Sequence, residues 1–239
     1  HIEFFSDLEE VIKEKKSLAK YTKKDGILIL NHNDNRVMEL YNYEDRKTFT
    51  FGTTKDSDLF IKKTVFDFDK NSSHGSTVEL SLQGRDYLLS LLNIASPGHV
   101  ISANIALLVV HALGFDIGNA IETLKDYRTP KGRFSIIDGI NNTTIIDDTY
   151  NSSPYAVSHA LSALNNIKTD GKKIGILGDM MELGLHTQTE HEKIGEEVIG
   201  VLDVLICVGN RSEYTYKQAL KKGLNKKNIF HVFSTDEVI

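Results

Sequence analysis

The chain has 239 residues, of which 40% are hydrophobic and 26% are charged, and its formal net charge is −5. This composition is that of a globular protein with a sizeable core, and the absence of a basic stripe argues against nucleic acid or an anionic membrane surface as partner. A single cysteine, Cys207, excludes an internal disulfide framework and indicates a reducing, cytoplasmic compartment. No apolar run reaches the roughly eighteen residues that a membrane-spanning helix needs.

The first half of the chain mixes helices with β-hairpins. A helix is predicted at 6–22, with acids in its first turn and lysines near its end, and a short apolar strand at 25–31. Period-two alternation with β-branched and aromatic residues then predicts strands and hairpins; these segments are 47–52, 59–69 and 76–92. Two helices follow, an apolar one at 99–116 and an amphipathic one at 117–127.

Pro130 and Gly132 mark a boundary between two domains, 1–129 and 130–239. After the boundary, strands alternate with helices, and several of the strands are almost continuously apolar. The predicted strands are 133–139, 142–150, 172–179, 201–209 and 228–233, and the predicted helices are 153–167, 187–200 and 213–223. Such alternation is typical of a parallel, doubly wound α/β sheet. Within it, Cys207 is expected to be a small buried strand residue.

Polar side chains gather at two predicted strand ends in the second domain. In IIDDTYNSSP (145–154), two aspartates finish a strand just before a helix, and in ILGDMMELG (176–184) two acids flank two methionines. Ligands of open α/β sheets collect at the carboxyl ends of the strands. Each segment also fits turn and helix-cap chemistry, with Met180 and Met181 packing beneath the loop.

Four sequence elements in this order resemble the C-terminal domain of Mur ligases. They are Gly132-Arg133, the segment from Asp148 to Pro154, the segment from Leu177 to Gly184, and His191 followed by Gly195. The match is to the branch of the family that adds D-alanyl-D-alanine to a UDP-muramoyl tripeptide. The resemblance implies an α/β fold class, in which the later part of a P-loop-type central ATPase domain precedes a Rossmann-like doubly wound C-terminal domain.

The same resemblance implies an ATP-dependent carboxylate–amine ligase of peptidoglycan precursor synthesis. In that reaction ATP converts the carboxylate of UDP-MurNAc-tripeptide to an acyl phosphate, which the amine of D-Ala-D-Ala then attacks. The implied cofactors are therefore ATP and Mg2+, and the implied partners are the two substrates, without nucleic acid. We expect a cytoplasmic monomer.

Residue roles also follow from the resemblance, which extends back to residue 1. His1 and Lys15, a lysine expected to be carbamoylated, would hold Mg2+. The residues expected to contact the nucleotide are Asn31, Asn104, Arg133, Asp148 (with Asp147 as an alternate), Tyr150 and Asn151. Catalysis would involve Lys15 together with three residues on the side of the incoming amine, namely Asp179, Glu182 and His191.

The sequence departs from the family pattern in three places. Asn33 stands where the family has an aspartate, Val100 stands where it has a histidine, and no Gly-x-x-Gly-Lys-Thr phosphate loop occurs. We therefore expect the chain to be part of a longer polypeptide and to be inactive alone. Two alternatives stay open: another Mur or folylpolyglutamate-type ligase with a different amine acceptor, and a non-catalytic Mur-ligase-like scaffold.

Overall fold

The computed structural model describes residues 5, 7–67, 75–92, 94 and 96–238. Two compact units make up the chain. The first comprises 7–130 together with 135–146, and the second comprises 131–134 together with 147–238.

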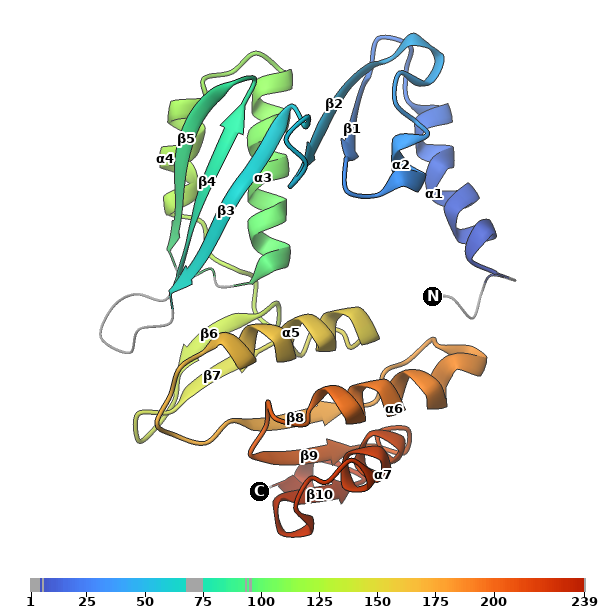
Figure 1. Cartoon of the computed structure of the whole chain (residues 1–239), viewed down its shortest axis with the longest axis vertical. Helices are drawn as coiled ribbons and strands as arrows, with labels where there is room; N and C mark the ends of the chain where they lie inside the picture. The colour runs from blue at the N-terminus through green and yellow to red at the C-terminus, as the bar shows by residue number, and fades with distance from the viewer. Residues whose placement is uncertain (1–4, 6, 68–74, 93, 95, 239) are drawn as a thin grey trace. The chain divides into compact units, whose positions relative to one another are not determined.

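A five-stranded sheet in the order β1-β2-β3-β4-β5 forms the centre of the first unit (Figure 1). Its strands are β1 (Ile27–Asn31), β2 (Lys47–Gly52), β3 (Leu59–Asp67), β4 (Gly75–Leu82) and β5 (Arg85–Leu92). The pairs β1–β2 and β2–β3 are parallel, whereas β3–β4 and β4–β5 are antiparallel. The antiparallel part is the series of hairpins that the period-two alternation predicts.

Four helices accompany this sheet: α1 (Leu8–Tyr21), α2 (Asn35–Met38), α3 (Pro97–Ala112) and α4 (Ile117–Lys125), with a short 3-10 turn, η2 (Tyr43–Asp45). The apolar helix α3 packs on β1, β2 and β4, and α4 packs on β5. Leu107 and Leu108 of α3 are fully buried against strand residues such as Leu80 and Leu89. Burial of these leucines is the main driving force for the unit.

Arg46, in the loop before β2, holds the end of α1 in place. Its side chain is 4% exposed. Its Nε and Nη2 donate to the carbonyl oxygen of Thr22 at 3.0 and 2.8 Å, and its Nη1 donates to Glu44 Oε2 at 2.8 Å. A buried guanidinium is stable only with such partners, so this residue is a structural clamp.

Residues 135–147 form a separate two-stranded sheet of β6 (Ser135–Asp138) and β7 (Thr144–Asp147). Asn141 and Asn142 at the tip have positive φ angles of 53° and 58°, and the Thr143 N–H donates to the Ile140 carbonyl at 3.1 Å. Asparagine tolerates this left-handed backbone, which makes a tight hairpin turn. The sequence predicted both strands, but their predicted place in the parallel sheet is wrong: they pair with each other, because a short turn and not a crossover helix joins them.

The second unit has a parallel three-stranded sheet in the order β10-β9-β8. Its strands are β8 (Ile174–Gly178), β9 (Val204–Val208) and β10 (Ile229–Val232), and its helices are α5 (Pro154–Asn166), α6 (Thr187–Glu197) and α7 (Glu213–Lys221), with short 3-10 turns η3 (Gly184–His186), η4 (Lys226–Asn228) and η5 (Thr235–Val238). The predicted strand–helix alternation with a parallel sheet is confirmed. Cys207 is fully buried, and burial raises the pKa of its thiol to about 12, so it is an inert core residue as predicted.

Helices α6 and α7 approach closely at Gly195. A Cβ at this position would lie 2.6 Å from the carbonyl oxygen of Thr215 and 2.8 Å from Gln218 Cβ. The fully buried Ala219 is part of the same contact. Small residues on both helices therefore let them pack backbone to backbone.

Candidate functional site

Two asparagine side chains order the turn after β1, and one of them, Asn33, links it to the residue after β2. Asn31 Oδ1 accepts the N–H of Asn33 at 3.0 Å. Asn33 Oδ1 accepts the N–H of Thr53 at 3.0 Å, while its Nδ2 donates to Thr53 Oγ1 at 3.1 Å. The amide of Asn33 thus acts as both acceptor and donor in this turn, whereas a carboxylate could only accept.

Asn104 lies inside α3 and is fully buried. Its Nδ2 donates to the Val100 carbonyl at 2.7 Å, but no donor among the described residues reaches its Oδ1. A buried amide oxygen without a donor is costly. This unmet acceptor is the structural feature of Asn104 that fits a ligand contact.

Of the two predicted magnesium ligands, His1 and Lys15, the structure describes one. His1 lies outside the described residues, and Lys15 is an exposed residue of α1. Within residues 5, 7–67, 75–92, 94 and 96–238, no three His, Cys, Asp or Glu side chains cluster as metal ligands.

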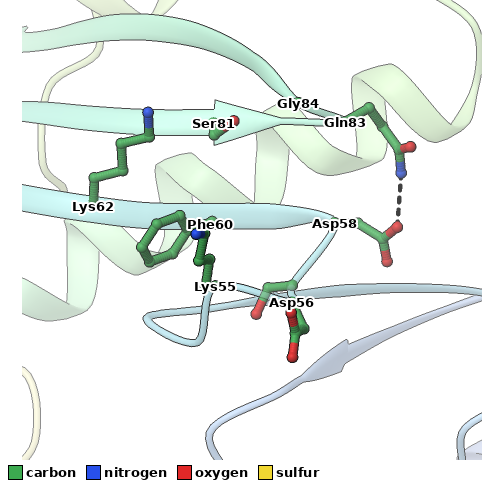
Figure 2. Close-up of a pocket in the computed structure, with 9 residues that line it drawn as sticks. Lys55, Asp56, Asp58, Phe60, Lys62, Ser81, Gln83 and Gly84 are labelled. Atoms are coloured by element: carbon green, nitrogen blue, oxygen red, sulfur yellow. Dashed lines mark hydrogen bonds between the residues drawn. The ribbon is translucent and has the colours of Figure 1, made fainter.

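A surface pocket of about 420 Å³ opens beside β3 and β4 of the first unit (Figure 2). Asp58 sits at its end and accepts hydrogen bonds from Gln83 Nε2 at 2.7 Å and from the N–H of Thr50 at 2.7 Å. Lys55 and Lys62 contribute cationic groups. None of the sequence-predicted site residues lines this pocket.

In the second unit, residues 132–134 and 148–150 are held together by a pair of hydrogen bonds, which we call the 132–150 clasp. The N–H of Tyr150 donates to the Gly132 carbonyl at 2.9 Å, and the N–H of Phe134 donates to Asp148 Oδ1 at 3.0 Å. Gly132 and Phe134 have positive φ angles of 71° and 51°. Asp148 therefore stabilises a strained backbone segment around Arg133.

Arg133 and Tyr150 stack on each other above the clasp. The guanidinium carbon lies 3.7 Å from the centre of the tyrosine ring, which is 69% exposed. Asn151 next to it is exposed, and its Oδ1 accepts the N–H of Ser152 at 2.9 Å. Hydrogen bonds from Thr149, chiefly its hydroxyl, lower the pKa of the Asp147 carboxyl. The structure thus brings together four predicted nucleotide contacts, Arg133, Asp148, Tyr150 and Asn151.

Asp179 follows β8 and holds the loop that follows β9. Its Oδ1 accepts the N–H groups of Arg211 at 2.9 Å and of Ser212 at 2.8 Å. Gly209, with φ of +107°, packs so closely that a Cβ there would lie 2.5 Å from Asp179 Oδ1. The geometry of Asp179 is therefore that of a positioning residue for the 209–212 loop.

Glu182 is half-buried in the loop after β8 and has a positive φ of 60°. A non-glycine residue in this region is uncommon and often marks a functional loop. Met180 is 2% exposed, so the prediction that it packs beneath the loop is confirmed. The same prediction for Met181 is wrong, since it is 51% exposed and its Sδ lies 3.0 Å from Arg211 Nη1.

His191 is 1% exposed, and both of its ring nitrogens are engaged. Its Nε2 accepts the N–H of Met180 at 3.1 Å, and its Nδ1 lies 2.8 Å from the Thr187 carbonyl, which assigns the proton to Nδ1. Burial lowers the pKa of the imidazole below its usual value. The Thr215 hydroxyl also donates to the His191 carbonyl at 2.9 Å. This geometry is that of a neutral histidine that ties α6 to the β8 loop and to α7.

Sequence reasoning missed Arg211, although it lies in this cluster. Its Nη1 is 3.8 Å from Asp179 Oδ2, and its side chain is 44% exposed. The available signal was its place in Gly-Asn-Arg-Ser, immediately after a buried strand and before a helix.

Comparisons with known protein families identify the family of the chain. The family model described as "Mur ligase middle domain" matches residues 1–110, and the one described as "Mur ligase, glutamate ligase domain" matches residues 132–239. The chain belongs to the Mur ligase family. The predicted fold class is confirmed with it.

Several relatives of this Mur ligase chain are enzymes of known type. The UDP-N-acetylmuramoyl-tripeptide–D-alanyl-D-alanine ligase of Rickettsia prowazekii is 30% identical over 236 residues, which cover 95% of this chain and 50% of that protein. The UDP-N-acetylmuramate–L-alanine ligase of Clostridium novyi is 28% identical over 173 residues, or 70% of this chain and 35% of that protein. The chain thus spans about half the length of the first of these relatives.

A solved structure supports the fold. MurF ligase from Thermotoga maritima, in complex with ADP, superposes with a TM-score of 0.77 at 24% identity, over 98% of this chain and 55% of that one. A membrane-crossing helix would have to be longer and more apolar than any helix in the described part of the chain.

Proposed function

We propose that this Mur ligase chain is part of an ATP-dependent ligase that adds D-Ala-D-Ala to UDP-MurNAc-tripeptide through an acyl phosphate. The observation that carries the proposal is the 30% identity to the Rickettsia prowazekii D-alanyl-D-alanine ligase over 95% of the chain. The Leu177–Gly184 element, which favours this branch of the family, lies at a strand end of the parallel sheet. We also propose that the protein is a monomer.

On the nucleotide side, the proposal assigns Arg133 and Tyr150 as an exposed stacked pair that faces ATP. A guanidinium is a fixed fork of donors suited to phosphate or ribose oxygens. Asp148 keeps that fork in place through the 132–150 clasp. The unmet oxygen of Asn104 fits a donor on a nucleotide, and Asn31 is assigned to the nucleotide side as well.

ATP supplies the phosphoryl group that makes the tripeptide carboxylate electrophilic, and Mg2+ neutralises phosphate charge. His1 and a carbamoylated Lys15 are the residues that we propose for the metal. Carbamoylation converts the lysine cation into an oxygen ligand of the type that Mg2+ prefers.

On the amine side, Asp179 and His191 hold backbone N–H groups and keep the loop after β8 in place. Glu182, in its left-handed conformation, is the carboxylate that we assign to the amine of the acceptor. It would bind the ammonium form and accept a proton as the amine attacks. Of the three residues expected on the amine side, we therefore assign Glu182 to the amine itself, and Asp179 and His191 to positioning the loop.

The proposal is tested with the full-length gene product, UDP-MurNAc-tripeptide, ATP and a panel of acceptors that includes D-Ala-D-Ala, L-alanine and L-glutamate. We expect phosphate release and product formation with D-Ala-D-Ala alone. Glu182→Gln should lower kcat, whereas the control Glu190→Gln, which removes the partner of Lys193 on α6, should not. The relative from Clostridium novyi makes an L-alanine ligase the second candidate, and preference for L-alanine would establish it. No ATP turnover with any acceptor would favour a scaffold.

A further inference from the structure

A half-exposed arginine lies at the carboxyl edge of the parallel sheet, one strand away from Glu182. Arg211 follows β9, and its guanidinium contacts Asp179 and Met181 in the loop after β8. Only Nη1 takes part in these contacts. For Nε and Nη2, no acceptor is found among the described residues.

The backbone of Arg211 is fixed independently of its side chain. Its N–H donates to Asp179 Oδ1, and Ser212 makes the same bond, so the carboxylate anchors the loop by main-chain groups. The salt bridge from Nη1 to Asp179 Oδ2 is long, at 3.8 Å, and leaves the fork of the guanidinium open. The neighbouring acid Glu213 is paired with Lys217 at 2.9 Å. A positive group with free donors therefore faces solvent at this edge.

A planar guanidinium with two adjacent free N–H donors is complementary to a carboxylate, which it binds through two parallel hydrogen bonds. The exposed side chain of Met181 borders it and offers an adaptable apolar surface for a small methyl group. The ligand chemistry that fits is a short, free carboxylate attached to a small apolar residue.

We propose that Arg211 binds the terminal carboxylate of the amine acceptor and is a specificity-determining residue of this ligase. The inference rests on the proposed function, in which the acceptor presents an amine at one end and a carboxylate at the other. In this arrangement the loop after β8 binds the amine end of the acceptor through Glu182, and the loop after β9 binds its carboxylate end through Arg211. Asp179 positions both loops.

The test compares D-Ala-D-Ala with its C-terminal carboxamide in the full-length enzyme and in Arg211→Ala, Arg211→Lys and Lys217→Ala. We expect Arg211→Ala to raise KM for D-Ala-D-Ala by about 10- to 100-fold, the range for a lost charge-assisted hydrogen bond. KM for ATP should not change. Wild type should discriminate against the carboxamide by a similar factor, and Arg211→Ala should not discriminate. Arg211→Lys should retain part of the effect, and Lys217→Ala, which removes a charge from α7, should behave as wild type.

Equal use of acid and carboxamide by wild type would overturn the proposal, as would unchanged discrimination in Arg211→Ala. A purely structural role for Arg211 would lower activity toward both acceptors alike, and this result also overturns it. If the wild type uses another amino acid in place of D-Ala-D-Ala, the proposed function fails. The role of Arg211 is then tested by comparing that amino acid with its own carboxamide. If no acceptor is used and calorimetry detects no D-Ala-D-Ala binding, both proposals fall.

Discussion

The buried imidazole of His191 predicts a pH dependence of stability that a single substitution should remove. Because burial lowers its pKa in the folded state, the unfolded chain binds a proton near the ordinary value of 6.5 while the folded chain does not. Between the folded and unfolded pKa values, the unfolded state binds more protons. Stability therefore falls as pH is lowered through 6.5 towards the folded value, and it is fully present above 6.5.

The size of this pH dependence follows from the binding of one proton to the imidazole in the unfolded state. The free energy of unfolding should change by at most about 1.4 kcal/mol per pH unit, and by at most about 1 kcal/mol between pH 6.5 and 5.5. His191→Gln keeps an acceptor for the Met180 N–H and cannot titrate. It should cost about 1 kcal/mol at pH 8, through the lost bond to the Thr187 carbonyl, and this difference should shrink as the pH falls.

Urea denaturation of the intact chain at several pH values, followed by circular dichroism, measures the pH dependence of the free energy of unfolding and the cost of His191→Gln. The other histidines are common to both proteins, so their contributions cancel in the difference. His159→Gln is the matched control, since it removes a histidine that packs on Tyr155 near the surface. Parallel stability curves for wild type and His191→Gln from pH 8 to 5.5 would refute the reasoning.

Other substitutions test the packing and the loops. Gly195→Ala should lower stability by about 1–3 kcal/mol in thermal unfolding, because its Cβ meets Thr215 and Gln218; Gly178→Ala, where a Cβ meets nothing within 4 Å, should not, and equal losses would contradict the contact. Arg46→Ala should cost about 1–3 kcal/mol in urea unfolding by leaving the Thr22 carbonyl unpaired, and a smaller loss than for the exposed Arg36→Ala would count against the clamp. Asp179→Ala should cost about 1–2 kcal/mol in thermal unfolding and Asp179→Asn less, since the amide oxygen still accepts both N–H groups; the reverse order would exclude an acceptor role.

Local pattern was sufficient to predict the type and order of most elements, whereas their ends differ from the predicted ones by up to four residues, as in the helix predicted at 99–116 and observed as α3. The helix predicted at 153–167 is α5, with Ser153 as its cap and Pro154 in its first turn, and the strand predicted at 172–179 is β8, which ends at Gly178. These boundaries depend on residues that are neighbours along the chain, such as a proline in the first turn or a glycine after an apolar run. The pairing of β6 with β7 was not predicted, although the two asparagines of its turn were a signal for it in the sequence.

Side-chain direction at the site was harder to predict. His191 shares one face of α6 with Ile194, Gly195 and Val198, at the spacing of a buried stripe, and this was the available signal that the ring points inward. Its assignment to the amine side followed from the family motif instead. For Arg211 the signal was only its place between a buried strand and a helix, because its contacts join loops 32 residues apart in the chain.

The contact between Asp179 and Gly209 restricts which substitutions the loops after β8 and β9 can accept in evolution. The carboxylate occupies the space that any side chain at 209 would need, and φ of +107° already excludes most other residues. A larger residue at 209 is therefore tolerated only together with loss of the carboxylate and rearrangement of the whole 209–212 loop. We expect the two positions to be inherited or lost as one unit among relatives, so that an alignment in which they vary independently would mark a differently folded acceptor loop.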